Sequence, residues 1–255
     1  MGKLLMPGFI ITAFKSRLHT LLVDTARENA RDLNLTALRL AAEDSVSFLA
    51  SSAPHAKSFK TKFDLLDSAL KAVSMEGLCC EFGVFEGKTI NYIASKWKGR
   101  VDGFDSFEGL PEDWRGDFGA GRFAVGALPS VQSNVVLHKG WFNETIPGFA
   151  SKHPEPLAFL HVDCDLYSST QTIFEMLADR IVSGTVIQFD EFFNYPGWRQ
   201  GEFKAFEEFC ADRRAEFEYI GYVSADEQLA IRITSIQPAR KSSPVSSEPS
   251  SLAVR

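Results

Sequence analysis

Four acidic side chains follow two apolar runs in the second half of the chain. Asp163 and Asp165 come directly after one run, and Asp190 and Glu191 come directly after the next. If the two runs are neighbouring strands, the four carboxylates meet in one crevice and repel one another unless protons or a hard divalent cation lie between them. Asp163, Asp190 and Glu191, with waters and substrate oxygens, would suit the octahedral coordination of Mg²⁺. The alternative is that some of these acids cap helices, as Asp165 could for the helix predicted after it.

A second group of residues has the spacing of a nucleoside site. Gly83 and Gly87 permit close backbone approach at a turn after an apolar run, although their spacing matches neither the dinucleotide fingerprint nor the phosphate-binding loop. Asp105 lies 22 residues after Gly83, where a carboxylate can bind both hydroxyls of a ribose. Glu81 could accept from an ammonium group, and Trp141 could stack on a purine ring. The alternatives are that the two glycines only form a structural turn, that Asp105 is a solvated loop residue, and that Trp141 is buried in the core or lies exposed at a rim.

The elements that must position these residues form an alternating pattern. Short apolar runs bounded by Gly, Asp or Pro cover residues 78–82, 101–104, 134–137, 157–162 and 185–189, and helix-length segments separate most of them. This alternation predicts βαβ units and a parallel sheet. Two further runs, 217–223 and 229–233, are joined by a short polar segment that contains Ser224-Ala225-Asp226-Glu227, and they predict an antiparallel hairpin. The expected fold class is α/β, with a seven-stranded, mostly parallel sheet and a C-terminal antiparallel hairpin.

Three further segments complete the expected organisation. Apolar residues at helical spacing predict an N-terminal helical extension over residues 1–56, and another helix over 59–73 opens a catalytic domain of residues 57–236. Residues 106–130 contain five glycines with little helical pattern, which favours a functional lid. Residues 237–255 hold three Pro and six Ser among 19 residues and predict a disordered tail. Later, Phe203, Phe206 and Phe209 recur at a spacing typical of a buried helix face.

Composition narrows the functional class. The chain has 255 residues, 45% of them hydrophobic, and a net charge of -6, which gives no basic face for nucleic acid. Four cysteines without a C-x-x-C spacing favour reduced thiols and a cytoplasmic location. An apolar patch at residues 7–11 is too short to span a bilayer and lacks a cleavage site typical of a signal peptide, so we expect no membrane association.

Five motifs taken in order carry a resemblance to a known family. They are E-F-G-V-F-E-G, D-S-F-E-G-L-P, G-W-F-N-E-T-I-P, H-V-D-C-D-L-Y-S-S-T and F-D-E-F-F-N-Y-P-G-W-R-Q-G-E, and they lie between residues 78 and 209. As an ordered set they resemble the macrocin O-methyltransferase family of class I S-adenosylmethionine (SAM)-dependent methyltransferases. The resemblance implies a Rossmann-like fold and Mg²⁺-assisted methylation of a hydroxyl on a sugar or glycosylated natural product. A homo-oligomer built partly through the N-terminal helices is also implied.

The resemblance also implies roles for individual residues. The implied cofactor-binding residues are Glu81, Gly83, Phe85, Gly87, Asp105, Ser106, Trp141 and Asp163. Among them, Glu81 and the two glycines would line the methionine and ribose side of SAM, and Asp105 would bind the ribose hydroxyls. Asp163, Asp190 and Glu191 match the metal triad, with Glu191 where members often carry Asp. No histidine matches a catalytic base, so Asp163 is the base we assign.

Three other interpretations remain open at this point. Asp163-Cys164-Asp165 is a D-x-D motif of the kind that holds a metal bound to a diphosphate, which would suit a nucleotide-sugar glycosyltransferase. The glycine turn upstream argues against it. A non-catalytic scaffold would not need all three presumed metal ligands. Phenolic acceptors with neighbouring hydroxyls would fit the same metal geometry as sugars.

Overall fold

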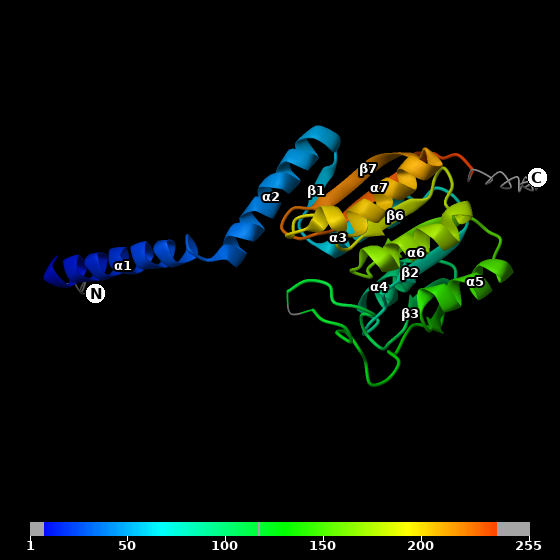
Figure 1. The fold of residues 1–255 in the computed structure, drawn as a ribbon, viewed down its shortest axis with the longest axis horizontal. Helices are drawn as coiled ribbons and strands as arrows, with labels where there is room; N and C mark the ends of the chain where they lie inside the picture. Colours follow the sequence, from blue (N-terminus) through cyan, green and yellow to red (C-terminus); the bar gives the residue numbers. More distant parts are fainter. Residues whose placement is uncertain (1–7, 117, 239–255) are drawn as a thin grey trace, which may run out of the picture.

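The protein is an α/β structure built on one eight-stranded sheet, and the computed structural model describes residues 8–116 and 118–238 (Figure 1). The strands are β1 (Lys57–Phe59), β2 (Leu78–Phe82), β3 (Val101–Asp105), β4 (Val135–Lys139), β5 (Leu157–Val162), β6 (Val186–Phe189), β7 (Glu216–Val223) and β8 (Leu229–Ser235). Their order is β1-β7-β8-β6-β5-β2-β3-β4. Only the pairs that involve β8 are antiparallel. The predicted fold class is therefore confirmed.

The sheet differs from the prediction by its additional edge strand, β1. The seven predicted strands are all present, and β1 pairs in parallel with β7, placing Lys57 opposite Gly221. Phe59, which we predicted to open a helix, belongs to this strand. The helix instead begins at Lys62, because the Thr61 hydroxyl accepts a hydrogen bond from the Asp64 backbone and caps it. A three-residue, half-polar strand carries no periodicity that a sequence pattern could reveal.

Helices cover both faces of the sheet. The helices of the described residues are α1 (Gly8–Asn29), α2 (Leu33–Ser52), α3 (Lys62–Ala72), α4 (Lys88–Lys96), α5 (Phe142–Lys152), α6 (Tyr167–Leu177) and α7 (Glu202–Arg213), with short 3₁₀ turns η1 (Ala178–Arg180) and η2 (Trp198–Gln200). Leu65 of α3 and Ile90 of α4 belong to one buried cluster, whereas α5, α6 and α7 contribute to the other. Within the second cluster Phe203, Phe206 and Phe209 are all buried, as predicted. Both faces of the central strands are therefore withdrawn from water.

Helix α1 extends away from the sheet, whereas α2 leads back to it (Figure 1). Phe48 of α2 is buried, with its ring centroid 5.5 Å from those of Trp198 and Phe203. By contrast, Leu18 and Leu22 of α1 are exposed. Across residues 8–116 and 118–238, every helix is too short or too polar to cross a bilayer. Apart from residues 237 and 238, the predicted disordered tail lies outside the described residues.

Candidate active site

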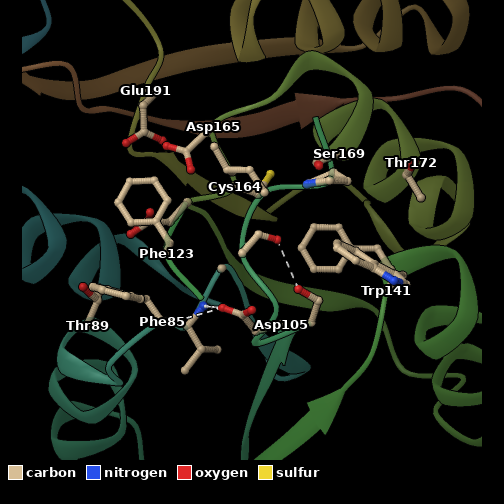
Figure 2. A pocket seen from close by; sticks show the side chains of 18 of the residues that line it. Phe85, Thr89, Asp105, Phe123, Trp141, Cys164, Asp165, Ser169, Thr172 and Glu191 are labelled. Atoms are coloured by element: carbon tan, nitrogen blue, oxygen red, sulfur yellow. Dashed lines mark hydrogen bonds between the residues drawn. The ribbon is translucent and has the colours of Figure 1, made fainter. Parts of the chain in front are cut away.

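A cavity of about 660 Å³ opens at the carboxyl ends of β2, β3, β5 and β6 (Figure 2). β5 lies between β2 and β6, so the segments that follow these strands converge at one edge of the sheet. Gly83, Asp105, Asp163 and Glu191 come from four of these strand ends, and all four line the cavity. The condition on which the sequence argument rested, that the two acidic strand ends are neighbours, is met.

The turn between β2 and α4 forms one wall of the cavity. Gly83 has a φ of +92°, and a Cβ at this position would lie 1.6 Å from the Asp163 carbonyl oxygen, so only glycine fits. Gly87, with a φ of +78°, is the N-cap of α4. The Asp105 carboxylate accepts hydrogen bonds from the backbone N–H groups of Val84 and Phe85, both at 2.8 Å, and so fixes the turn against β3.

The predicted nucleoside-binding residues occupy one part of the cavity. Asp105, Ser106, Trp141 and Phe85 all line it. In Figure 2, Asp105 and Trp141 lie away from the end occupied by Asp165 and Glu191. Trp141 is the N-cap residue of α5, with no side-chain cap, so its indole contributes cavity surface rather than a cap. The arrangement offers a carboxylate and an aromatic ring to the same occupant.

Glu81 lies below the cavity rather than in its wall. Its side chain is fully buried, and Oε1 is 2.9 Å from Nδ1 of His161 on the neighbouring strand. Burial raises the pKa of Glu81, and the hydrogen bond from His161 partly opposes that rise. The cofactor role that we predicted for Glu81 therefore remains a prediction, since the structure places its carboxylate among protein groups.

The acidic strand ends form a cluster with two nearby cations, Lys62 and His161. Lys62 Nζ lies 3.1 Å from Asp190 Oδ2 and 3.7 Å from Asp163 Oδ2. Burial alone would lower the pKa of Lys62, but the two carboxylates raise it above the ordinary lysine value. His161, Asp163 and Asp190 each offer one ligand atom within a set whose members lie within 4.8 Å of one another. Such a set is compact enough to surround a single ion.

Asp165 lines the cavity beside this cluster. Its backbone adopts a left-handed conformation with a φ of +66°, which is uncommon outside glycine and turns the residue away from the strand direction. Burial raises the pKa of Asp165 to about 7, with Arg115 opposing the rise and Asp190 adding to it. The helix-capping alternative is not observed, because α6 begins after Leu166 without a side-chain cap. The Asp165 carboxylate makes no hydrogen bond with another described side chain.

Glu191 and Glu202 add two more buried carboxylates. Glu191 lies beside Asp165 in Figure 2, and Glu202 Oε2 accepts a hydrogen bond from the Glu191 backbone at 3.2 Å. Burial and neighbouring carboxylates raise the pKa of both groups. Among the described residues, Asp190 Oδ1, Glu191 Oε2 and Glu202 Oε1 have no hydrogen-bond partner. A buried carboxylate oxygen loses its water on folding, and without a hydrogen bond nothing compensates that loss. Coordination of a hard cation would supply the compensation.

The predicted lid contains no helix or strand over 106–116 and 118–130, and side chains attach it to the rest of the protein. Arg115 donates two hydrogen bonds to Glu227, in the β7–β8 turn, at 3.0 and 2.7 Å. Its guanidinium also lies 4.0 Å from the ring centroid of Trp114 and 4.2 Å from that of Tyr195. At a second point of the lid, the Ser168 hydroxyl of α6 donates a hydrogen bond of 2.5 Å to the Glu112 carboxylate. These contacts hold the lid against the cavity.

Sequence reasoning underrated several residues of the site. Lys62 carried no motif, and its partner Asp190 is 128 positions away in the chain. Neither His161 nor Glu202 was among the residues that the sequence predicted for the site. The one available signal for His161 was its position in β5 two residues before Asp163, which directly follows the strand, because extended residues two apart point to the same side.

Comparison with known proteins places this geometry in a family. A family model described as macrocin-O-methyltransferase (TylF) matches residues 50–216. The crystal structure of CalS11, a calicheamicin methyltransferase, is similar with a TM-score of 0.56 and 23% identity, covering 79% of this chain and 93% of that chain. The O-methyltransferase NovP is similar with a TM-score of 0.51 and 21% identity, covering 68% and 79%. No curated protein matches the chain significantly. The glycosyltransferase alternative receives no support from these findings.

Proposed function

The chain belongs to the macrocin O-methyltransferase family of SAM-dependent enzymes, and we propose that it methylates a hydroxyl of a sugar or glycosylated natural product with the assistance of Mg²⁺. The observation that carries this proposal is the shared cavity, because Asp105 lines the same space as Asp163, Asp165 and Glu191. A nucleoside-binding carboxylate and a cation site are thereby adjacent. Natural-product methylation is also supported by the likeness to CalS11, described as a calicheamicin methyltransferase.

Asp105 is the residue we propose to hold the ribose of SAM. Its Oδ2 accepts from the turn after β2, and its side chain still lines the cavity. Gly83 and Gly87 would allow the backbone to approach the cofactor closely, as their positive φ values support. Phe85, Ser106 and Trp141 would contact the adenosine or methionine portions.

An Asp105→Ala variant is expected to bind S-adenosylhomocysteine about 10²-fold more weakly than the wild type. The reason is that two hydrogen bonds to a charged carboxylate are lost, each worth roughly 1.5–3 kcal/mol. Isothermal titration calorimetry of both proteins with S-adenosylhomocysteine measures the effect. Because Asp105 also supports the turn, Asp105→Asn provides a second variant, whose amide oxygen can still accept from Val84 and Phe85 while the hydrogen bond from the Phe107 backbone to Oδ1 is lost.

Glu108→Ala is the matched control, since Glu108 is an exposed acid near Asp105 that does not line the cavity. It should bind S-adenosylhomocysteine as the wild type does. A wild-type affinity in both Asp105 variants would remove Asp105 from the cofactor site.

The donor set fits the metal that the family resemblance implies. Asp163, Asp190 and Glu191 would hold Mg²⁺: Asp163 and Asp190 belong to a set of ligand atoms within 4.8 Å of one another, and Asp190 and Glu191 each have an unpaired buried oxygen. When bound, Mg²⁺ supplies a Lewis acid that makes an acceptor hydroxyl more acidic, and SAM supplies a methyl group on a sulfonium. Glu191, in place of the more usual Asp, has one more methylene with which to reach the site.

Asp165 is the residue we now favour as the base, in place of Asp163. Asp163 lies 3.7 Å from the Lys62 ammonium and belongs to the candidate ligand set, so we assign its carboxylate to the metal rather than to proton transfer. Asp165 lines the same cavity without a hydrogen-bonded partner in the described chain. Its carboxylate can therefore take the proton of an acceptor hydroxyl.

The chain's own residues would then perform three tasks. The turn after β2 and Asp105 fix the methyl donor, which matters because displacement requires the acceptor oxygen within roughly 3–3.5 Å and in line. Asp165 receives the hydroxyl proton on its carboxylate. The lid, attached through Arg115 and Glu112, excludes water from the cavity.

We further propose that two copies of the chain associate through the predicted N-terminal extension. Phe14, Leu18, Leu21 and Leu22 share one face of α1 and are exposed. A helix in water gains most of its stability from packing of such a face, and a second copy offers an identical one. Light scattering of the 28.3 kDa chain should give a dimer or larger species, and Leu18→Lys with Leu22→Lys should reduce it to a monomer.

Leu128→Lys is the control for this double variant, because Leu128 is an exposed leucine of the lid. Its mass should equal that of the wild type. A monomeric wild type would contradict the proposed association.

A further inference from the structure

Below the cavity, a buried histidine and a buried glutamate form a pair that the proposed reaction does not yet use. Glu81 of β2 and His161 of β5 are register partners in the parallel sheet. Both side chains have no exposed surface, and Nδ1 of His161 lies 2.9 Å from Oε1 of Glu81. A carboxylate bonded to one ring nitrogen fixes both the tautomer and the orientation of an imidazole.

The other ring nitrogen of His161 faces a proposed metal ligand. Nε2 lies 3.7 Å from Asp190 Oδ1, a charge contact longer than a hydrogen bond. The second oxygen of Asp190, Oδ2, lies 3.1 Å from Lys62, which lines the cavity. The two oxygens of the Asp190 carboxylate thus have different neighbours: Oδ1 lies nearest the buried His161, and Oδ2 lies nearest Lys62.

We propose that Glu81 and His161 act as a positioning pair, in which Glu81 orients the imidazole and Nε2 holds Asp190 so that Oδ2 is presented to the metal. This inference rests on the proposed role of Asp190 as a metal ligand. It assigns Glu81 a function in the metal site instead of the predicted contact with SAM. The unpaired atoms Nε2 and Asp190 Oδ1 are the ones that a small movement on metal binding would bring together.

The same sheet contains a comparable pair that serves as an internal control. His138 of β4 has Nε2 2.7 Å from Oδ1 of the buried Asp102, which also pairs with Arg100. Neither His138 nor Asp102 lines the cavity. Disturbing this pair tests the loss of a histidine contact with a buried carboxylate without disturbing Asp190.

The experiment compares Mn²⁺ affinity and S-adenosylhomocysteine affinity in three variants. His161→Asn keeps a donor near Glu81 but has no atom in the place of Nε2, and it should weaken Mn²⁺ binding about 10- to 100-fold. Glu81→Gln should also lower the Mn²⁺ affinity, because the imidazole of His161 is no longer fixed by a carboxylate. His138→Asn should bind Mn²⁺ as the wild type does. S-adenosylhomocysteine affinity should stay unchanged in all three.

The outcomes separate this inference from the proposed function. If the wild type binds Mn²⁺ and His161→Asn binds it within twofold, the positioning role is overturned while the metal site stands. If Mn²⁺ and S-adenosylhomocysteine affinities fall together, the pair has only a structural role and the inference is again overturned. A wild type that binds no Mn²⁺ overturns the metal site and the pair together. Should His161→Asn fail to fold, Glu81→Gln decides by the same criteria.

Discussion

An Asp165→Asn enzyme is expected to lose roughly 10²- to 10⁴-fold in turnover while it binds S-adenosylhomocysteine and Mn²⁺ as the wild type does. The amide has nearly the size of the carboxylate but cannot accept the proton of an acceptor hydroxyl. Asp165 lines the cavity, whereas Asp163 and Asp190 are in contact with Lys62. Transfer of a labelled methyl group, measured with the sugar or phenolic acceptor that the wild type methylates best, gives the turnover.

Asp113→Asn is a suitable control for this substitution. Asp113 belongs to the lid, where its carboxylate accepts a hydrogen bond from the Ala120 backbone at 2.9 Å, and it does not line the cavity. Its turnover should stay within a few-fold of the wild type. If Asp165→Asn retained more than a tenth of wild-type turnover, the base would have to be sought elsewhere, with Asp163 as the first alternative.

Much of the fold followed from local patterns. Strands buried on both faces are read from continuous apolar runs, and β2 and β5 have the bounds predicted for them. The edge strand β1 was missed because its residues lie on the rim of the sheet and only one of the three is apolar. Burial, rather than strand propensity, is what makes a strand visible in sequence.

The site was only partly accessible from the sequence. Residues at or directly after strand ends, such as Asp105, Asp163 and Glu191, could be placed because parallel strands deliver their ends to one edge. The contacts of Lys62 and Glu81 could not be predicted, because their partners depend on register and on helix placement across 80 or more positions. The sequence around a glutamate that precedes a glycine turn is the same whether the side chain faces the cavity or a buried histidine, so the sequence does not distinguish the two.

Asp190→Asn is expected to weaken Mn²⁺ binding at least about 10²-fold, and to remove the stimulation of methyl transfer by Mg²⁺. The variant loses one anionic ligand from a site that hard cations select through carboxylate oxygens. The remaining carboxylates do not compensate, because Asp163 and Glu191 would then face the positive charge of Lys62 with one anion fewer. Mn²⁺ affinity is measured by calorimetry, and methyl transfer is measured with and without Mg²⁺.

Asp102→Asn provides the matched comparison for Asp190→Asn. Both aspartates are buried in the same sheet, each between a histidine and a basic residue, but only Asp190 belongs to the candidate ligand set. Loss of a buried carboxylate as such would therefore affect both variants, whereas loss of a metal ligand affects Asp190→Asn alone. Equal Mn²⁺ affinity in the wild type and Asp190→Asn would remove Asp190 from the metal site and, with it, the reason for this cluster of buried carboxylates.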